Sequence, residues 1–432
     1  MGDLPSVGER MREDWNRRAR EDAHYYVAFG GRDQGEEEFD STAADVLKNL
    51  EAELKRLPKD ANRRSWRALE IGCGPGRLLR PMSRHFGEIH GVDVSDEMIA
   101  LARERLREIP HAHVHATNGA SLAQFADESF DFVYSYAVFQ HIPSRDVVLE
   151  YMREIRRVLK PGGIFRGQFN GLQTYDAPTT WIGVNFSCDE MHAFTREHGL
   201  LLMDLIGCDT QYLWTTWHKP LQWPPTDRQQ RPTTIRRIAH AYSWECAVPN
   251  RGRHAAIAVL LADLPEHCDL NTLQVLIDGA AATPCYVGPP GSDGLRQINA
   301  WLPKEARTGL LPVELRYNGQ PLCRPGIVRV IPAGPLVPRI VSVTDGTNLL
   351  QANRCTTGQL KVQLEEVTEP ESITASIDGL PVAGIEFLCI DPRPPRHDVN
   401  LRLPEHLPPG RHVLQLRVGP RRLLPAEIET TS

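Results

Sequence analysis

Residues 69–76, Leu-Glu-Ile-Gly-Cys-Gly-Pro-Gly, constrain the fold more than any other stretch of this 432-residue chain. An apolar run passes through an acid into three glycines at alternate positions. Glycine has no Cβ and adopts positive φ at little cost, so this run lets a strand turn tightly into a helix while its backbone lies against a ligand. We therefore expect Gly72, Gly74 and Gly76 to line a ligand site.

The spacing of these glycines bears on the ligand. A dinucleotide-binding loop has the pattern G-x-G-x-x-G, and its third glycine opens the helix beneath a pyrophosphate. Arg77 stands at that third position. The spacing therefore disfavours a nicotinamide-dependent oxidoreductase, which we keep as one alternative.

The pattern E-x-G-x-G-x-G resembles the first motif of the class I S-adenosylmethionine-dependent methyltransferases of the bacterial small-molecule type. The next segments follow the family in order and spacing. Residues 88–95 form an expected strand that ends in Asp93, near the roughly 20-residue separation from the loop to a ribose-binding acid. Four further segments match the family: Asn118-Gly119 after the expected strand His113–Thr117, Ser129–Ser135, Phe139–Ile142, and Leu159–Gly163 before the fifth strand Ile164–Phe169.

The resemblance implies S-adenosyl-L-methionine as the cofactor and gives each matching position a role. Glu70 would support the loop and the methionine end of the cofactor, Asp93 would hold the ribose, and the adenine would lie near Val94, Met98, Asn118 and Gly119. The complete expected cofactor-binding set is Tyr26, Glu70, Gly72, Cys73, Gly74, Gly76, Arg77, Asp93, Val94, Met98, Asn118, Gly119 and Ser135. Tyr26 lies in a leading segment that resembles the family's lid, and simple packing of Tyr25 and Tyr26 on the core is the alternative.

His141 is the candidate catalytic residue. A sulfonium methyl group is already activated, so the enzyme mainly aligns the acceptor and excludes water. Deprotonating a hydroxyl acceptor would need a general base, for which histidine is suited near neutral pH. His141 follows the expected fourth strand, whose carboxyl end faces cofactor and acceptor in this architecture. A histidine that caps or packs the following helix is the other interpretation.

Composition excludes several classes of function. A net charge of −6 argues against nonspecific nucleic-acid binding. No stretch approaches the ~20 consecutive apolar residues of a membrane span, and the N-terminus lacks the apolar core of a secretory signal. The nine cysteines are odd in number and never spaced as C-x-x-C, so we expect reduced thiols, no metal site and a cytoplasmic protein.

The C-terminal half has a different pattern. After a Pro- and Arg-rich connector, short Val/Ile/Leu runs alternate with Pro, Gly and Asp turns, which is typical of an all-β region. Ile277-Asp278-Gly279 recurs as Ile377-Asp378-Gly379, and Leu302-Pro303 recurs as Leu403-Pro404. A repeat of about 100 residues indicates two tandem sandwiches that resemble bacterial immunoglobulin-like repeats.

We therefore expect a multidomain chain: a doubly wound, Rossmann-like α/β domain with seven strands, then two all-β immunoglobulin-like sandwiches. The expected boundaries are 1–220 for the methyltransferase domain, 221–254 for the connector, and 255–336 and 337–432 for the β-domains. The expected function is methyl transfer to a small-molecule or sugar-like acceptor, at oxygen. The alternative is a non-catalytic scaffold whose β-domains mediate protein or glycan contacts.

Overall fold

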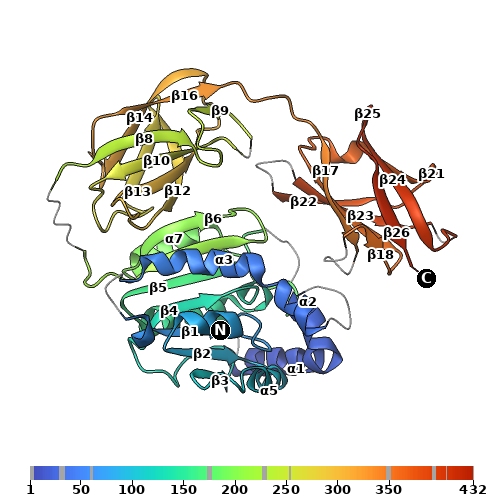
Figure 1. Ribbon diagram of the computed structural model, residues 1–432, viewed down its shortest axis with the longest axis horizontal. Helices are drawn as coiled ribbons and strands as arrows, with labels where there is room; N and C mark the ends of the chain where they lie inside the picture. The colour runs from blue at the N-terminus through green and yellow to red at the C-terminus, as the bar shows by residue number, and fades with distance from the viewer. Residues whose placement is uncertain are drawn as a thin grey trace. The chain divides into compact units, whose positions relative to one another are not determined.

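A computed structural model describes residues 4–28, 35–58, 62–172, 178–225, 231–252, 254–346, 352–391, 396–404 and 406–431 (Figure 1). The chain divides into two compact units. The first comprises Met1–Arg20 and Ala43–Ala333, and the second comprises Glu21–Thr42 and Gly334–Ser432. No described helix is long and apolar enough to cross a membrane.

The N-terminal part of the first unit is built on parallel strands in the order β3-β2-β1-β4-β5, followed by antiparallel β7 and then β6 (Figure 1). In chain order they are β1 (Arg67–Ile71), β2 (Glu88–Asp93), β3 (Ala112–Ala116), β4 (Phe130–Ser135), β5 (Leu159–Phe169), β6 (Leu201–Ile206) and β7 (Leu213–His218). The predicted Rossmann-like α/β arrangement is confirmed. The segment Leu159–Gly163, expected to precede the fifth strand, is instead the first part of β5.

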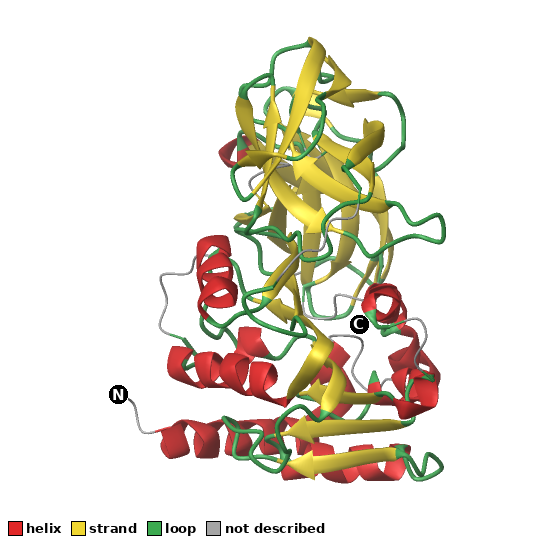
Figure 2. Ribbon diagram, turned by 90° about the vertical axis from the view of Figure 1, so that its left-hand side faces the viewer, coloured by secondary structure: helices red, strands yellow, loops and turns green. Residues whose placement is uncertain are grey.

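Helices flank this sheet (Figure 2). They are α1 (Leu4–Ala28), α3 (Ala44–Glu53), α4 (Leu79–Met82), α5 (Asp96–Arg105), α6 (Arg145–Val158) and α7 (Cys188–Glu197), and α2 (Glu36–Ser41) lies in the second unit. Two separate clusters of buried apolar side chains pack on the sheet, one with Phe165 and Trp217 and the other with Phe132 and Tyr134. Val133 lies in the first cluster and its neighbours Phe132 and Tyr134 lie in the second, so successive residues of β4 pack on opposite faces of the sheet.

Polar side chains begin the helices that follow the strands. Ser95 accepts from Met98 N at the start of α5. Ser187 and Glu190 form a reciprocal capping box at the start of α7. Each cap satisfies backbone N–H groups that have no partner within the helix, and so fixes where the chain leaves the preceding loop.

The first β region continues the sheet of the N-terminal part. Tyr286 of β12 pairs with Asp204 of β6, and Asp269 Oδ2 accepts from Leu202 N at 2.9 Å. The strands are β8 (Thr234–His240), β9 (Ala247–Pro249), β10 (Ala256–Ala262), β11 (Leu273–Ile277), β12 (Ala280–Val287), β13 (Arg296–Trp301), β14 (Gly309–Tyr317), β15 (Gln320–Pro321) and β16 (Gly326–Ile331). The segment 221–254, expected to be a connector, therefore contains β8 and β9, because β8 pairs with β10 and β9 with β16.

The C-terminal region of the second unit has two sheets that share one apolar core. Four strands pair in the order β17-β19-β23-β22, and six belong to the sheet of β18, β26, β24, β20, β21 and β25. Their bounds are β17 (Arg339–Asp345), β18 (Arg354–Cys355), β19 (Gln359–Glu365), β20 (Ile373–Ile377), β21 (Leu380–Pro381), β22 (Glu386–Asp391), β23 (Arg396–Arg402), β24 (Gly410–Val418), β25 (Arg421–Arg422) and β26 (Ala426–Thr430).

The repeated Asp-Gly pairs occupy equivalent turns in the two β regions. Asp278-Gly279 and Asp378-Gly379 follow β11 and β20, and all four residues have positive φ. Two consecutive residues at positive φ are the requirement of a type I′ hairpin turn, which Asp-Gly satisfies. The recurrence of this pair in the sequence thus reflects turn geometry.

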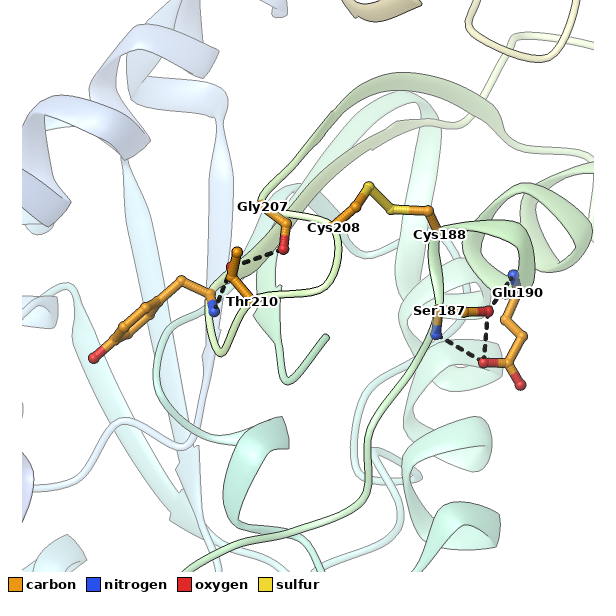
Figure 3. Close-up of a disulfide and its surroundings, with 7 residues drawn as sticks. Ser187, Cys188, Glu190, Gly207, Cys208 and Thr210 are labelled. Carbon is orange, nitrogen blue, oxygen red and sulfur yellow. Dashed lines mark hydrogen bonds between the residues drawn. A yellow bond between two sulfur atoms is a disulfide. The ribbon is translucent and has the colours of Figure 1, made fainter. Parts of the chain in front are cut away.

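The prediction that all cysteines are reduced is wrong for one pair. Cys188 at the start of α7 and Cys208 in the turn between β6 and β7 form a disulfide (Figure 3). The fold brings these two segments together across 20 residues of sequence. The bond therefore ties the segment that enters α7 to the β6–β7 turn, close to the carboxyl end of β5, where Gly171 N donates to Thr210 O.

Candidate functional site

The glycine loop leaves β1 with its backbone in a conformation that favours glycine. Gly72, Gly74 and Gly76 have φ values of 70°, 51° and 84°. Gly72 N donates to Val92 O at 2.8 Å, so the loop is held against β2. A Cβ at Gly72 would lie 2.2 Å from Val138 Cγ2, so any larger residue here would collide with the segment after β4.

Asp93 connects the end of β2 to this loop. Its Oδ2 accepts from Gly74 N at 2.9 Å, and its Oδ1 accepts from Ser95 N at 2.9 Å. Desolvation raises the pKa of Asp93, while the backbone N–H groups of Ser95, Gly74 and Val94 counteract the rise. Each carboxylate oxygen accepts more than one hydrogen bond, so Asp93 retains capacity for hydroxyl donors.

Glu70 is buried at the end of β1 beside the loop. Tyr134 of β4 donates from its hydroxyl to Glu70 Oε2 at 3.0 Å. Desolvation raises the pKa of Glu70 to about 8, against the hydrogen bond from Tyr134 and the charge of Arg77, which lower it. A buried carboxyl group that holds its proton at neutral pH is poised to ionise when a cation binds nearby.

The expected adenine-binding residues lie together at the ends of β2 and β3. Asn118 Oδ1 accepts from the backbone N of Ala120 and Ser121, which shapes the turn after β3. A Cβ built on Gly119 would lie 3.0 Å from Val94 and 2.9 Å from Met11 of α1. Met98 is buried on α5, one turn from the Ser95 cap. The first turns of α1 therefore pack directly on this part of the site.

Three other members of the expected set have local roles in the structure. Ser135 Oγ donates to Ile71 O at 3.0 Å and is buried, so it joins the ends of β4 and β1. Cys73 is buried, and desolvation raises the pKa of its thiol, which disfavours a reactive thiolate. The Arg77 guanidinium lies 5.8 Å from the centre of the Tyr136 ring.

Tyr26 belongs to the second compact unit. Its hydroxyl donates to Glu21 Oε2 at 2.9 Å, and its ring meets Tyr25 edge to face with centroids 5.1 Å apart. A role for Tyr26 over the cofactor remains a prediction.

His141 is buried just beyond β4, in the short helical turn Phe139–His141. Its Nδ1 lies 2.7 Å from Trp181 O, and its Nε2 lies 3.2 Å from Gln140 Nε2. Desolvation lowers the pKa of His141 to about 4, against the hydrogen bond to Trp181, which raises it. His141 is therefore neutral at physiological pH, and both of its ring nitrogens are engaged in this conformation.

An aromatic and guanidinium cluster covers His141. Trp15 of α1 and Trp181 lie 5.7 and 5.6 Å from its ring. The Arg18 guanidinium lies over both indole rings, at 4.6 and 5.0 Å, and donates to Thr180 O at 3.0 Å. Asp14 pairs with Arg18 at 2.8 Å. The cluster ties α1 to the segment after β5 and shields His141 from solvent.

Sequence reasoning did not identify several polar residues at the site. Asn16 Oδ1 accepts from Ser95 Oγ at 2.7 Å and from Glu97 N at 3.2 Å, which links α1 to the start of α5. Gln168 is completely buried near the end of β5 and bonds Gln140. β5 also contains Lys160 and Arg166, so no sequence signal distinguished Gln168 from the other polar residues of this strand. Among the described residues, no group of three or more His, Cys, Asp or Glu is arranged to hold a metal ion.

Comparison with known proteins identifies the domain around this site. Residues 69–166 match a family described as "Methyltransferase domain". The chain is similar to phosphoethanolamine N-methyltransferase 2 of Caenorhabditis elegans, at 40% identity over 97 residues, or 22% of each chain. It is also similar to a ubiquinone biosynthesis O-methyltransferase of Ruegeria pomeroyi, at 36% identity over 102 residues, or 23% of this chain and 38% of the relative.

Among solved structures, the chain is similar to geranyl diphosphate C-methyltransferase from Streptomyces coelicolor A3(2), with a TM-score of 0.36 and 14% identity over 49% of this chain and 97% of that one. The chain spans well under half the length of the two curated relatives. The prediction of a methyltransferase domain is confirmed for residues 69–166, as is S-adenosylmethionine as the methyl donor that such a domain uses.

Proposed function

We propose that the whole chain is an S-adenosylmethionine-dependent methyltransferase that acts on a small-molecule or sugar-like acceptor, at oxygen. One observation carries the proposal: Gly74 N donates to Asp93 Oδ2 at 2.9 Å, so the glycine loop and the acid that ends β2 meet at one point. A loop with a bare backbone beside a carboxylate fits a ligand that has both an amino-acid tail and a ribose.

The residues present fit this cofactor. Glycines at positive φ leave the backbone of the loop accessible, and Asp93 retains lone pairs for two ribose hydroxyls. Glu70, which is buried and protonated without ligand, would take the α-ammonium of the methionine tail as a carboxylate. Val94, Met98, Asn118 and Gly119 would border the adenine. The cofactor supplies an electrophilic methyl group, and the chain supplies alignment and exclusion of water.

The acceptor would bind and react at the carboxyl ends of β4 and β5. The cluster of Trp15, Arg18 and Trp181 would exclude water above His141. For His141 to act as the general base, the acceptor hydroxyl would have to replace the Gln140 amide as the donor to Nε2. The bound cofactor would supply the methyl group to the acceptor oxygen, and His141 Nε2 would take the proton that the hydroxyl gives up.

The other parts of the chain complete the proposal. The two C-terminal β regions would be immunoglobulin-like sandwiches that provide contacts to a protein or glycan, with the methyltransferase domain ending near residue 220. The seven strands β1 to β7 would be the complete catalytic sheet. We propose a cytoplasmic location, supported by thiols such as Cys323 and Cys355, whereas the Cys188–Cys208 disulfide is the observation against it.

The test is a pair of titrations of the full chain, one with S-adenosylmethionine and one with NAD, followed by transfer of a labelled methyl group to a panel of small hydroxyl compounds. We expect S-adenosylmethionine to bind, NAD not to bind, and at least one hydroxyl compound to accept the label. Cofactor binding without transfer to any acceptor would favour the scaffold alternative. Tighter binding of NAD would contradict the proposal.

A further inference from the structure

The amide of Gln168 is buried, and the backbone groups around it are compatible with only one orientation. Its Oε1 lies 3.0 Å from Ala137 N, which is a donor. Its Nε2 lies 2.8 Å from Phe169 O and 2.9 Å from Gln211 O, which are acceptors. Because backbone groups cannot exchange these roles, the orientation of the Gln168 amide is fixed.

The orientation of the Gln168 amide determines that of the Gln140 amide. Gln168 Nε2 donates to Gln140 Oε1 at 2.8 Å, so the other end of the Gln140 side chain is its amide nitrogen. That nitrogen lies 3.2 Å from His141 Nε2 and can only donate. His141 Nε2 is therefore the acceptor, which requires it to be unprotonated.

The contact at Nδ1, on the opposite side of the imidazole, indicates the same protonation of the His141 ring. His141 Nδ1 lies 2.7 Å from Trp181 O, and a carbonyl oxygen can only accept. The proton of the neutral ring is therefore on Nδ1. Two independent backbone references, the groups around Gln168 and the Trp181 carbonyl, specify one tautomer with its lone pair on Nε2.

We propose that Gln168 is a positioning residue for methyl transfer, which acts through Gln140 to hold His141 as the Nδ1–H tautomer and to hold the segment after β4 in place. Gln168 also accepts from the backbone of Ala137, whose φ of 56° is unusual for a residue with a side chain. The catalytic meaning of this arrangement rests on the proposed function, whereas the hydrogen-bond chain can be measured without any cofactor or acceptor.

The role of Gln168 differs from simple filling of the core. Gln168 has no contact with His141 that would set its tautomer, because Gln140 stands between them. A purely structural glutamine would affect stability and leave the hydrogen bond to His141 Nε2 unchanged once the protein is folded. The two effects can therefore be separated by a measurement on the ring nitrogens of His141.

The experiment uses the full chain labelled with ¹⁵N in its histidine rings, studied by NMR at pH 7 without ligand. His141→Asn identifies the His141 resonances. For the wild type we expect a protonated Nδ1 and an unprotonated Nε2. Gln140→Leu and Gln168→Leu should each move the Nε2 resonance of His141 further from the protonated type, because the Nε2 lone pair loses or weakens its donated hydrogen bond while Trp181 O still keeps the proton on Nδ1. The double variant should show no more change than Gln140→Leu alone.

Gln274→Leu, on an exposed position of β11, is the matched control and should leave the resonances unchanged. If Gln168→Leu does not fold, Gln168→Glu, which keeps the shape of the side chain, takes its place. A protonated Nε2 in the wild type would overturn the proposal, as would a His141 spectrum that is unchanged in folded Gln168 variants. S-adenosylmethionine titration of the same wild-type sample tests the proposed function separately, since the tautomer result does not depend on it.

Discussion

Asp93 Oδ2 accepts a hydrogen bond from Gly74 N at 2.9 Å, so the acid at the end of β2 holds the middle glycine of the loop that follows β1. The two strands are neighbours and parallel, and their carboxyl ends meet at this contact. A loop fixed in this way is arranged before any ligand arrives. Preorganisation of this kind reduces the entropy that ligand binding must overcome.

Gly74→Val tests the loop directly. A branched side chain at Gly74 would occupy the space that the methionine tail needs, and the φ of 51° adds strain of about 1–2 kcal/mol. We expect loss of measurable S-adenosylmethionine binding while circular dichroism reports a folded protein. Gly279→Val is the control, since Gly279 has a φ of 80° and nothing within 4 Å of an added Cβ. A folded Gly74→Val protein with normal affinity would remove this loop from the binding site.

The raised pKa of Glu70 predicts that cofactor binding releases a proton. Its pKa of about 8 means that the ligand-free protein carries a protonated Glu70 at pH 7. An ammonium group placed beside it would favour the carboxylate, so binding should release a proton. Calorimetric enthalpies in buffers with different ionisation enthalpies measure this release. Glu70→Gln should abolish the buffer dependence, and equal dependence in both proteins would contradict the assignment.

The raised pKa of Glu70 also predicts that the stability of the protein depends on pH. The folded-state pKa of Glu70 lies above its usual value of 4.5, so the folded state holds this proton more tightly than the unfolded state. The contribution of Glu70 to stability is therefore largest below about pH 4.5 and declines as the pH rises to about 8. Relative to Glu70→Gln, the wild type should lose unfolding free energy over this interval in urea titrations.

How much of this could be predicted from the sequence depends on how local the interaction is. The glycine loop, the Ser95 cap and the Asp-Gly turns follow from adjacent residues, so their patterns are visible in the chain. Gln140 and Gln168 are 28 residues apart and meet only because β4 and β5 are neighbours. Nothing in the type of either residue distinguishes a buried amide relay from a surface glutamine.

The disulfide and the continuation of the sheet could not be predicted from the sequence for the same reason. Cys188 and Cys208 meet because α7 and the β6–β7 turn pack together, and cysteine spacing alone does not specify that pairing. The apolar run of β6 indicates a strand but not what lies beside its free edge. The structure places β12 and Asp269 there, within a segment of the chain expected to fold by itself.

Removing the disulfide should lower stability. A closed loop of about 20 residues restricts the unfolded chain, and its loss costs about 3 kcal/mol by the chain-entropy account. We expect Cys188→Ser/Cys208→Ser to lower the unfolding free energy by about that amount in denaturant titrations. Cys246→Ser, at an exposed thiol, should have little effect. Equal stability of the double variant and the wild type under oxidising conditions would contradict a formed bond.

Asp269 should hold the first β region on the edge of β6. Its Oδ2 accepts from Leu202 N at 2.9 Å and its Oδ1 from Thr272 Oγ1 at 2.6 Å, and Asp269 is buried. Asp269→Ala leaves buried donors without an acceptor, which costs about 1–3 kcal/mol. Thermal unfolding should show the loss, whereas the neighbouring exposed Glu266→Ala should not. A stability equal to that of the wild type would mean that this contact does not secure the junction.

The most direct test of the central claim is a calorimetric titration of the wild type and Asp93→Ala with S-adenosylmethionine. Loss of two ribose hydrogen bonds to a charged acceptor should cost about 2–4 kcal/mol, or about 30- to 1000-fold in affinity. Asp96→Ala is the control, since this exposed carboxylate is the first residue of α5, three positions after Asp93, and its removal should leave affinity unchanged. Because Asp93 also holds Gly74, circular dichroism must show a folded variant. Tight binding by the wild type with a loss of that size in Asp93→Ala is the predicted result, and unchanged affinity in a folded Asp93→Ala would contradict the account.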